Sequence, residues 1–217
     1  VPLIHRLYAL IFKTFRRKRM EQLLAFARFT PSTRALDVGG HPWFWKGVEL
    51  PCRVTLLNLS VPPELEPYRD RFDLVAGDGT RLAYADREFD LAVSNSVIEH
   101  VGTWENQQRF AREIRRVADR LWVQTPAREF FIEPHLLAPV VHWLPRRVQR
   151  RLIRNFTGFG WLARPSPARV EAFLDEVRLL TYAEMRELFP DCEIRRERVL
   201  GLTKSYVAVR PPSAGAR

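Results

Sequence analysis

The fold is indicated by one stretch of sequence, Ala35-Leu36-Asp37-Val38-Gly39-Gly40-His41-Pro42. A short apolar run that ends in an acidic residue and two glycines is typical of a buried strand followed by a tight turn. Glycine has no Cβ, so the backbone of such a turn can approach a ligand closely. The stretch therefore predicts a strand whose carboxyl end lies beside a bound molecule.

Further strands are predicted after this one, and three of them end in polar residues. The predicted strands as a set cover residues 34–38, 53–57, 74–77, 89–94 and 120–125. The polar residues are Asn58 after the second strand, Asp78 with Gly79 after the third, and Ser94 with Asn95 at the fourth. Asn58 follows Asp37 at close to the roughly 20 residues at which nucleotide-binding α/β units place a ribose-binding group. The carboxyl ends of parallel strands meet at one edge of a sheet, so the pattern predicts a ligand crevice there.

Helix signals separate and follow the strands. Capping residues mark three helix starts, at Thr103, Ser166 and Thr181. The last of these has the spacing of a capping box with Glu184. Residues 193–199 and 204–209 then predict a closing antiparallel strand pair. Helices and strands in alternation favour an α/β fold in which helices cover a mostly parallel sheet.

This succession of strand ends resembles the class I S-adenosylmethionine-dependent methyltransferases over residues 33–126, in the subgroup with a Glu-His pair after the fourth strand. The most distinctive part is Ser94-Asn95-Ser96-Val97-Ile98-Glu99-His100-Val101. The resemblance implies a Rossmann-like three-layer sandwich with a seven-stranded sheet, S-adenosylmethionine as cofactor and no metal ion. It implies these cofactor-binding residues: Asp37, Gly39 and Gly40 at the methionine part, Asn58 at the ribose, Asp78 and Gly79 at the adenine, and Ser94 or Asn95 closing the pocket.

Two departures from the family pattern bear on this site. The glycine turn continues into the aromatic residues Trp43, Phe44 and Trp45 instead of a further glycine. Trp43 is expected either to face the sulfonium and the acceptor or to cover the sheet edge. Asn58 stands where the family has an acid, so we expect neutral hydrogen bonds, weaker by about 1 kcal/mol. A nicotinamide-dependent dehydrogenase is disfavoured because the first strand is not followed by Gly-x-Gly-x-x-Gly.

Charge favours anionic partners. The 217-residue chain has 35 Lys and Arg against 25 Asp and Glu, a formal net charge of +10. A basic helical face is predicted from Arg146, Arg147, Arg150, Arg151 and Arg154. The chain lacks the Asn/Asp-Pro-Pro-aromatic sequence of enzymes that methylate base amino groups, so nucleic acid is not the expected acceptor. We expect O-methylation of a small-molecule, sugar or lipid-linked acceptor. The alternative is an inactive, basic nucleic-acid- or membrane-binding module.

One methyltransferase domain is predicted over residues 1–210. Its expected parts are an N-terminal helix (1–30), a cofactor-binding core (31–126), a substrate lid (127–165), final helices and strands (166–210) and a flexible tail (211–217). The basic N-terminal helix is expected to pack on the domain, the alternatives being a transit peptide or a membrane-surface helix. No membrane span is predicted, and Cys52 and Cys192 lack metal-ligand spacing. A cytoplasmic protein is expected, with peripheral contact to the anionic inner membrane face left open.

The predicted lid is a helical insertion after the fifth strand. It is rich in proline, aromatic and arginine residues, which is typical of binding loops. The expected acceptor-binding residues are Trp43, Arg128, Glu133 and Tyr182. His135 is the candidate general base because it follows the fifth strand, where loops face the crevice, and because imidazole titrates near neutral pH. Its alternative role is to hydrogen-bond the lid. His100 is the second candidate, with the alternative of holding its own loop.

Overall fold

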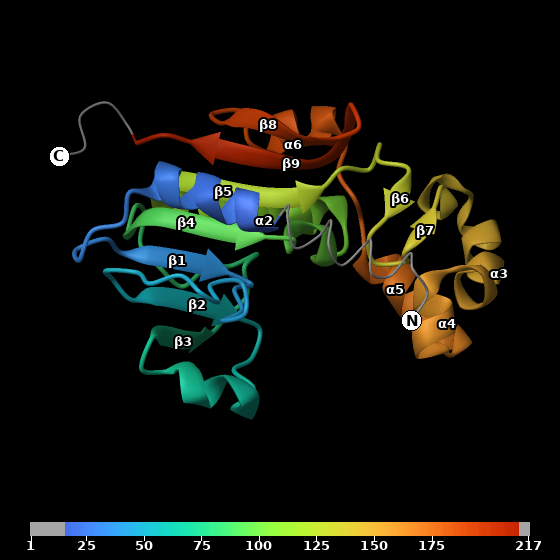
Figure 1. The fold of residues 1–217 in the computed structure, drawn as a ribbon, viewed down its shortest axis with the longest axis horizontal. Coiled ribbons are helices and arrows are strands. Elements are labelled where there is room, and N and C mark those ends of the chain that lie inside the picture. Colours follow the sequence, from blue (N-terminus) through green and yellow to red (C-terminus); the bar gives the residue numbers. More distant parts are fainter. Residues whose placement is uncertain (1–15, 213–217) are drawn as a thin grey trace.

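A seven-stranded sheet forms the centre of the computed structural model, which describes residues 16–212 (Figure 1). Its order is β3-β2-β1-β4-β5-β9-β8. The parallel strands are β1 (Ala35–Val38), β2 (Val54–Asn58), β3 (Phe72–Ala76), β4 (Phe89–Asn95) and β5 (Ala118–Pro126). The closing hairpin of β8 (Glu193–Val199) and β9 (Leu202–Arg210) adds to β5 through antiparallel pairing of β9. The predicted Rossmann-like α/β sandwich is confirmed.

Helices cover both faces of the sheet because each presents an apolar stripe. A helix over residues 16–27 buries Met20, Leu23 and Ala27 against one face. The opposite face is covered by α2 (Trp104–Val117) and α6 (Tyr182–Leu188). The first of these two buries Phe110 and Ile114. Both core layers therefore extend to the edge at which the parallel strands end.

The predicted helix starts are confirmed at the level of single hydrogen bonds. Side chains of Thr103, Ser166 and Thr181 accept from backbone N–H groups one turn on. Thr181 and Glu184 form the reciprocal capping box. These bonds satisfy N–H groups that a helix start otherwise leaves without partners.

A small lobe beside the carboxyl edge of the sheet has its own core (Figure 1). It contains β6 (Ile132–Glu133), β7 (Ala138–Pro139), α3 (Arg146–Phe156), α4 (Gly158–Ala163) and α5 (Pro167–Glu176), together with the 3-10 turn η3 (Val141–Trp143). Leu136, Ile153 and Phe173 meet in that core. Since α5 shares the core, residues 127–176 act as one packing unit, called the lid from here on.

The first half of the predicted N-terminal helix, residues 1–15, lies outside the described residues. Among residues 16–212, no helix has the combination of length and apolar character needed to cross a membrane.

Candidate active site

A cavity of about 640 Å³ opens where β1, β2, β3 and β4 end. Its lining includes four of the predicted cofactor residues, Gly39, Asn58, Asp78 and Gly79, and also His41, Val97, His100 and Phe110. The lining residues come from separate strand ends that parallel pairing brings to the same edge. This cavity is therefore the crevice that the sequence pattern predicts.

Two glycines keep the cavity open. Gly39 has φ of 73°, and a Cβ on it would lie 2.5 Å from Val97 Cγ2. A Cβ on Gly79 would lie 2.8 Å from both Phe110 Cε2 and Val38 Cγ1. A side chain at either place would force packed neighbours to move, so the backbone can border the cavity only as glycine.

Asn58 and Asp78 each have one side-chain oxygen that accepts no hydrogen bond from a described residue. Asn58 Nδ2 donates to the carbonyl oxygen of Gly40 at 2.8 Å. Asp78 Oδ1 accepts from the backbone N–H and the hydroxyl of Thr80, both at 2.8 Å. These bonds fix the two side chains and leave Asn58 Oδ1 and Asp78 Oδ2 as acceptors for a ligand.

Asp37 lies behind the glycine turn and does not line the cavity. It is buried, and its Oδ2 accepts from Trp45 Nε1 at 2.8 Å. Its Oδ1 has no hydrogen-bond partner. Burial raises the pKa of Asp37 to about 7, against the lowering effect of the Trp45 bond. Gly40 packs directly on the carboxylate, because a Cβ there would overlap it.

Several other predicted site residues point elsewhere. Ser94 is buried and donates to Val38 O at 3.0 Å, and Asn95 Oδ1 accepts from Arg19 Nη1 at 2.9 Å. Trp43 is 59% exposed, with the guanidinium carbon of Arg16 3.9 Å from its ring centroid. Tyr182 packs under Arg196, whose guanidinium carbon lies 4.0 Å from the ring centroid. None of these four predicted residues lines the cofactor cavity or the lid cleft.

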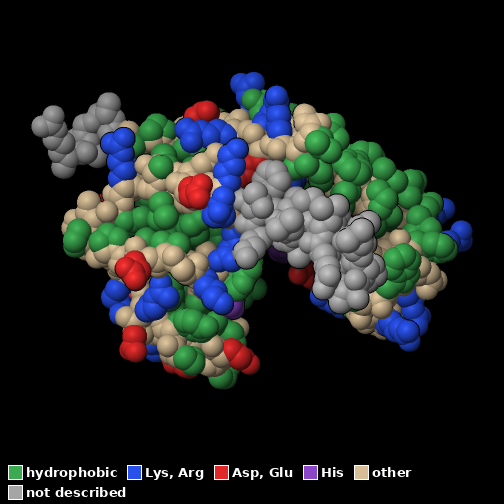
Figure 2. Space-filling model, in the orientation of Figure 1, with side chains coloured by type: hydrophobic (Ala, Val, Ile, Leu, Met, Phe, Trp, Pro, Cys, Tyr) green, Lys and Arg blue, Asp and Glu red, His purple; other side chains and the backbone are tan. Residues whose placement is uncertain are grey.

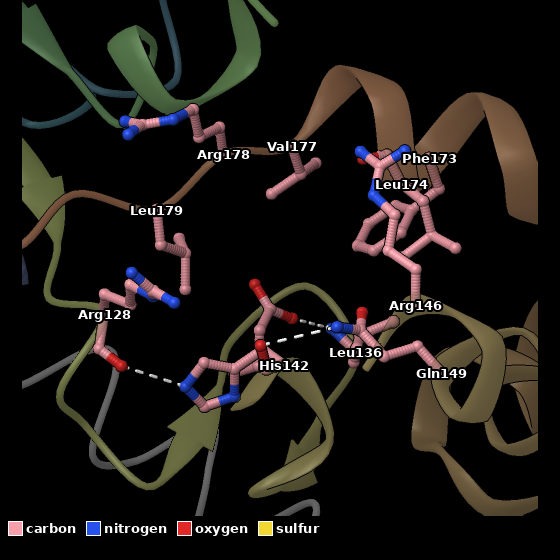
Figure 3. Close-up of a pocket in the computed structure, with 11 residues that line it drawn as sticks. Arg128, Leu136, His142, Arg146, Gln149, Phe173, Leu174, Val177, Arg178 and Leu179 are labelled. Carbon is pink, nitrogen blue, oxygen red and sulfur yellow. Dashed lines mark hydrogen bonds between the residues drawn. The ribbon is translucent and has the colours of Figure 1, made fainter. Parts of the chain in front are cut away.

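A second cleft, of about 280 Å³, lies between the lid and residues 177–179, which follow it (Figure 3). The predicted residues Arg128 and Glu133 are both part of its lining. Its apolar lining includes Leu136, Phe173, Leu174 and Leu179, and its polar lining includes His142, Arg146 and Arg178. Arg146 pairs with Asp175, and Arg178 pairs with Glu184. The guanidinium of Arg128 forms no ion pair with a described residue, so it is the cation of this cleft that is open to a ligand.

Two histidines and three glutamates lie between the two cavities. We call Glu99, His100, Glu133, His135 and Glu176 the Glu-His cluster. His135 Nδ1 lies 2.6 Å from Glu133 Oε1, and the His135 and His100 ring centroids are 4.6 Å apart, edge to face. His100 Nδ1 lies 3.6 Å from Glu176 Oε1. Because His100 lines the cofactor cavity and Glu133 lines the lid cleft, the cluster joins the two.

Burial acts on the pKa values of Glu99, His100 and His135 in this cluster. It raises the pKa of Glu99 to about 7 and lowers that of His100 below its ordinary value. Burial alone would also lower the pKa of His135, but the bond to Glu133 and the nearby carboxylates raise it above the ordinary value. Glu99 Oε2 accepts from Thr125 Oγ1 at 2.9 Å, whereas its Oε1 has no partner.

Sequence reasoning assigned no functional role to Glu99, Glu176, Val97 or Phe110. Glu99 is adjacent to His100 in the distinctive run, which is a local signal for its position. Glu176 comes from α5 and meets His100 only through the packing of the lid. No local pattern could indicate that contact.

Comparison with known proteins agrees with this architecture. A family model described as a methyltransferase domain matches residues 47–120. No curated protein matches the chain. A crystal structure of an S-adenosylmethionine-dependent methyltransferase from Aquifex aeolicus is 14% identical, with a TM-score of 0.51, 88% of this chain and 87% of that chain covered.

Two more solved structures cover nearly the whole chain. The 1,6-didemethyltoxoflavin-N1-methyltransferase of Burkholderia thailandensis, with 1,6-didemethyltoxoflavin and S-adenosylhomocysteine bound, is 17% identical, with a TM-score of 0.53 and coverage of 97% and 92%. The magnesium protoporphyrin IX methyltransferase of Synechocystis PCC 6803, with S-adenosylhomocysteine bound, is 12% identical, with a TM-score of 0.57 and coverage of 97% and 88%. The predicted resemblance is confirmed: the chain has the class I methyltransferase fold, and its residues 47–120 match the methyltransferase-domain family.

Proposed function

We propose that the chain is an S-adenosylmethionine-dependent methyltransferase that acts on an oxygen of a small-molecule, sugar or lipid-linked acceptor. The observation that carries the proposal is the cavity at the converging strand ends, with its glycine borders. Its volume of about 640 Å³ is within the range of roughly 300–1,000 Å³ usual for small-ligand sites. The family match and the cofactor product bound in two neighbours support the same assignment.

The free acceptor atoms suggest how the cofactor is held. Asn58 Oδ1 would accept a hydrogen bond from a ribose hydroxyl, and Asp78 Oδ2 one from the adenine amine. Because Asn58 Nδ2 is already bonded to Gly40, only one of its atoms serves the ribose. Gly39 would allow the methionine part to pass close to the backbone, and Phe110 would pack against the adenine ring.

The lid cleft is the proposed acceptor site. Its apolar wall and the guanidinium of Arg128 fit an acceptor with one apolar and one anionic part. The Glu-His cluster lies at the passage between cleft and cavity and offers hydrogen-bond partners to an acceptor hydroxyl, which is why we propose an oxygen nucleophile. When bound, S-adenosylmethionine supplies a methyl group on a sulfonium. The chain's own contribution is to hold the acceptor oxygen in line with that methyl and to exclude water, since positioning lowers such barriers strongly.

The lid also has a surface that suits an anionic membrane. Phe156, Trp161 and Leu162 are 65%, 65% and 71% exposed, although all are apolar. Arg147, Arg151 and Arg154 are exposed on α3 and form no ion pair with a described residue. Figure 2 shows hydrophobic side chains gathered over the lid with Lys and Arg at its borders. We propose that this lid surface contacts anionic lipid, where each such arginine contributes about 1 kcal/mol.

Calorimetry with S-adenosylhomocysteine tests the cofactor assignment. Saturable one-site binding and a raised melting temperature are expected for the full chain. Asn58→Ala should weaken binding about tenfold, because a ribose hydroxyl loses its acceptor at a cost of about 1–2 kcal/mol. Asn155→Ala, an exposed amide on α3, is the matched control and should bind like the wild type.

Transfer of labelled methyl onto hydroxylated acceptors that carry a carboxylate or phosphate would then test the reaction. Folded protein that gives neither heat nor a thermal shift would contradict the proposal. If that protein still bound anionic vesicles or nucleic acid, the inactive basic module would be the better description.

A further inference from the structure

The Glu-His cluster has the composition and the surroundings of a metal site. A carboxylate oxygen of Glu99 and one ring nitrogen each of His100 and His135 all lie within 4.8 Å of one another. Glu99 comes from η2 (Ile98–His100) after β4, whereas His135 comes from the lid. Folding therefore brings together two imidazoles and a carboxylate that the chain holds far apart in sequence.

Glu99 supplies an independent indication of a missing partner. Its side chain is fully buried, and Thr125 Oγ1 donates to its Oε2 at 2.9 Å. The other oxygen, Oε1, is buried without any hydrogen-bond partner. A buried carboxylate oxygen in this state is costly unless a cation or a donor meets it.

Two of the three groups, Glu99 and His135, are also held by a hydrogen bond from a neighbouring side chain. Thr125 orients the Glu99 carboxylate, and Glu133 Oε1 lies 2.6 Å from His135 Nδ1, which leaves Nε2 of that ring for another contact. Glu176 Oε1 lies 3.6 Å from His100 Nδ1, which is longer than a hydrogen bond, and that nitrogen is buried without a hydrogen-bond partner. A carboxylate that orients a ligand histidine, as Glu133 does for His135, is a regular feature of metal centres and sets both the tautomer and the ring orientation.

The charge around the cluster favours a cation. Neither Glu99 nor Glu133 forms an ion pair with a Lys or Arg among residues 16–212, although the protein as a whole is strongly basic. Two imidazoles and one carboxylate form the ligand set of several zinc hydrolases and of non-haem iron sites. Ligand atoms around a tetrahedral zinc ion are about 3.4 Å apart, so small side-chain rotations would close the site.

We propose that Glu99, His100 and His135 bind a divalent transition-metal ion, with zinc as the first candidate. Three protein ligands leave a coordination position open. His100 lines the cofactor cavity and Glu133 lines the lid cleft, so that position would face the passage between them. The use of the ion to hold the acceptor oxygen rests on the proposed function, but the metal site itself does not. The proposal departs from the sequence-based expectation of no metal ion.

The test uses the full chain, with any affinity tag removed, stripped by a chelator and titrated with Zn²⁺ by calorimetry. One equivalent should bind saturably, and Co²⁺ in its place should give the visible absorption of a protein-bound ion. Glu99→Gln and His135→Ala should each weaken Zn²⁺ binding at least tenfold. Glu133→Gln, which removes the group behind His135, should weaken it by about 10- to 100-fold. Glu187→Gln, which changes an exposed carboxylate on α6 away from both cavities, is the control for adventitious binding and should bind like the wild type.

S-adenosylhomocysteine binding is measured on the same samples, which shows whether each variant is folded and separates the two proposals. Cofactor binding without saturable Zn²⁺ binding would overturn the metal site. Glu133 and His135 would then be a hydrogen-bonded carboxylate–imidazole pair with no metal ion. Equal Zn²⁺ affinity in wild type, Glu99→Gln and His135→Ala would overturn it as well. Zn²⁺ binding that depends on these residues, in protein that binds no cofactor, would support the metal site and contradict the proposed function instead.

Discussion

Asp37 illustrates how one buried carboxyl group, at the edge of the sheet where the cofactor cavity opens, affects the stability of the fold. Its side chain is fully enclosed, with one oxygen bonded to Trp45 and the other without a partner. Burial raises its pKa to about 7 from the ordinary 3.8. The folded chain therefore holds this group protonated at pH values where the unfolded chain has already released the proton.

The sign of the pH effect follows from linkage. Below about pH 4, Asp37 is protonated in both states and costs nothing. As pH rises from about 4 to 7, only the unfolded state ionises, so stability is progressively lost, by up to about 4 kcal/mol. Asp37→Asn has no such ionisation and keeps an oxygen for the Trp45 bond. We expect the variant to match the wild type near pH 4 and to be more stable at pH 8.

Urea unfolding at a series of pH values measures this difference. Asp70→Asn, which changes an exposed aspartate, is the control. A stability gap between Asp37→Asn and the wild type that stays constant from pH 4 to pH 8 would contradict the assigned protonation.

At the level of elements, the features that could be predicted from the sequence are those that depend on residues close together in the chain. Capping hydrogen bonds join residues three apart, so Thr103, Ser166 and Thr181 could be identified from spacing alone. Strand ends could also be predicted, because an apolar run and the glycine turn after it are adjacent in the sequence. The directions in which the side chains of Ser94 and Asn95 point could not be predicted. Successive side chains of a strand alternate between the two faces of the sheet, and the acceptor of Ser94 belongs to another strand, β1.

The lid was predicted as a helical insertion after the fifth strand, and α3 and α4 agree with that, but its short strands and its packing were not predicted. Its strands, β6 and β7, have two residues each, too few to show any alternation. Its core joins Leu136 to Phe173 of α5, which the sequence assigned to the final helices. For the same reason the contact of His135 with His100 could not be predicted, because it depends on how the lid packs against the sheet.

Removing the unpaired arginines of α3 should release the protein from anionic vesicles. The triple change Arg147→Gln, Arg151→Gln and Arg154→Gln removes about 3 kcal/mol of attraction, or roughly hundredfold in partitioning. Co-sedimentation is measured with vesicles of phosphatidylcholine and phosphatidylglycerol. Binding of the wild type should fall as salt shortens the screening length from about 30 Å at 0.01 M to about 10 Å at 0.1 M.

A triple change elsewhere is the matched control for net charge. Arg109, Arg112 and Arg186 are exposed on α2 and α6, over a face of the sheet, and their change to Gln removes the same charge. Equal loss in both triples would mean that net charge, and not the lid surface, attracts the protein. If the wild type does not bind vesicles even at low salt, the arginines form only a solvent-exposed helix face without a role in membrane binding.

On the scale of the whole molecule, Arg19 joins the N-terminal helix to β8, the last strand at one edge of the sheet. It is 8% exposed and donates from Nε and Nη2 to both carboxylate oxygens of Glu197 on β8. Its Nη1 donates to Asn95 of β4 at 2.9 Å and to Gln124 of β5 at 3.0 Å. Gln124 in turn accepts from Ser96, which lines the cofactor cavity. Arg19 Nη2 also donates to Ser205 of β9 at 3.5 Å, so one guanidinium connects a helix, four strands and the wall of the site.

Arg19→Met tests how much this connection contributes. The variant leaves the Glu197 carboxylate buried without its cation, which typically costs about 3–5 kcal/mol. Despite its burial, Glu197 has a pKa held below the ordinary value by Arg19, so the wild-type pair loses stability as pH falls and Glu197 protonates. In Arg19→Met that carboxylate keeps only the Ser205 hydroxyl and the nearby charge of Lys204, so acid should relieve much of the penalty and narrow the stability gap between variant and wild type.

The double change Arg19→Met and Glu197→Met should recover the part of the loss that comes from the ion pair, because two apolar side chains can replace a buried ion pair at little cost. The hydrogen bonds from Arg19 to Asn95 and Gln124 stay broken in both variants. Urea unfolding of the two single variants and the double variant gives the coupling directly. Arg17→Met removes a cation from the same helix, in an i,i+4 pair that is 80% and 65% exposed, and should change stability by less than about 0.5 kcal/mol. Additive losses in the cycle would mean that Arg19 and Glu197 contribute separately, and the N-terminal helix would then be held to the sheet by its apolar face alone.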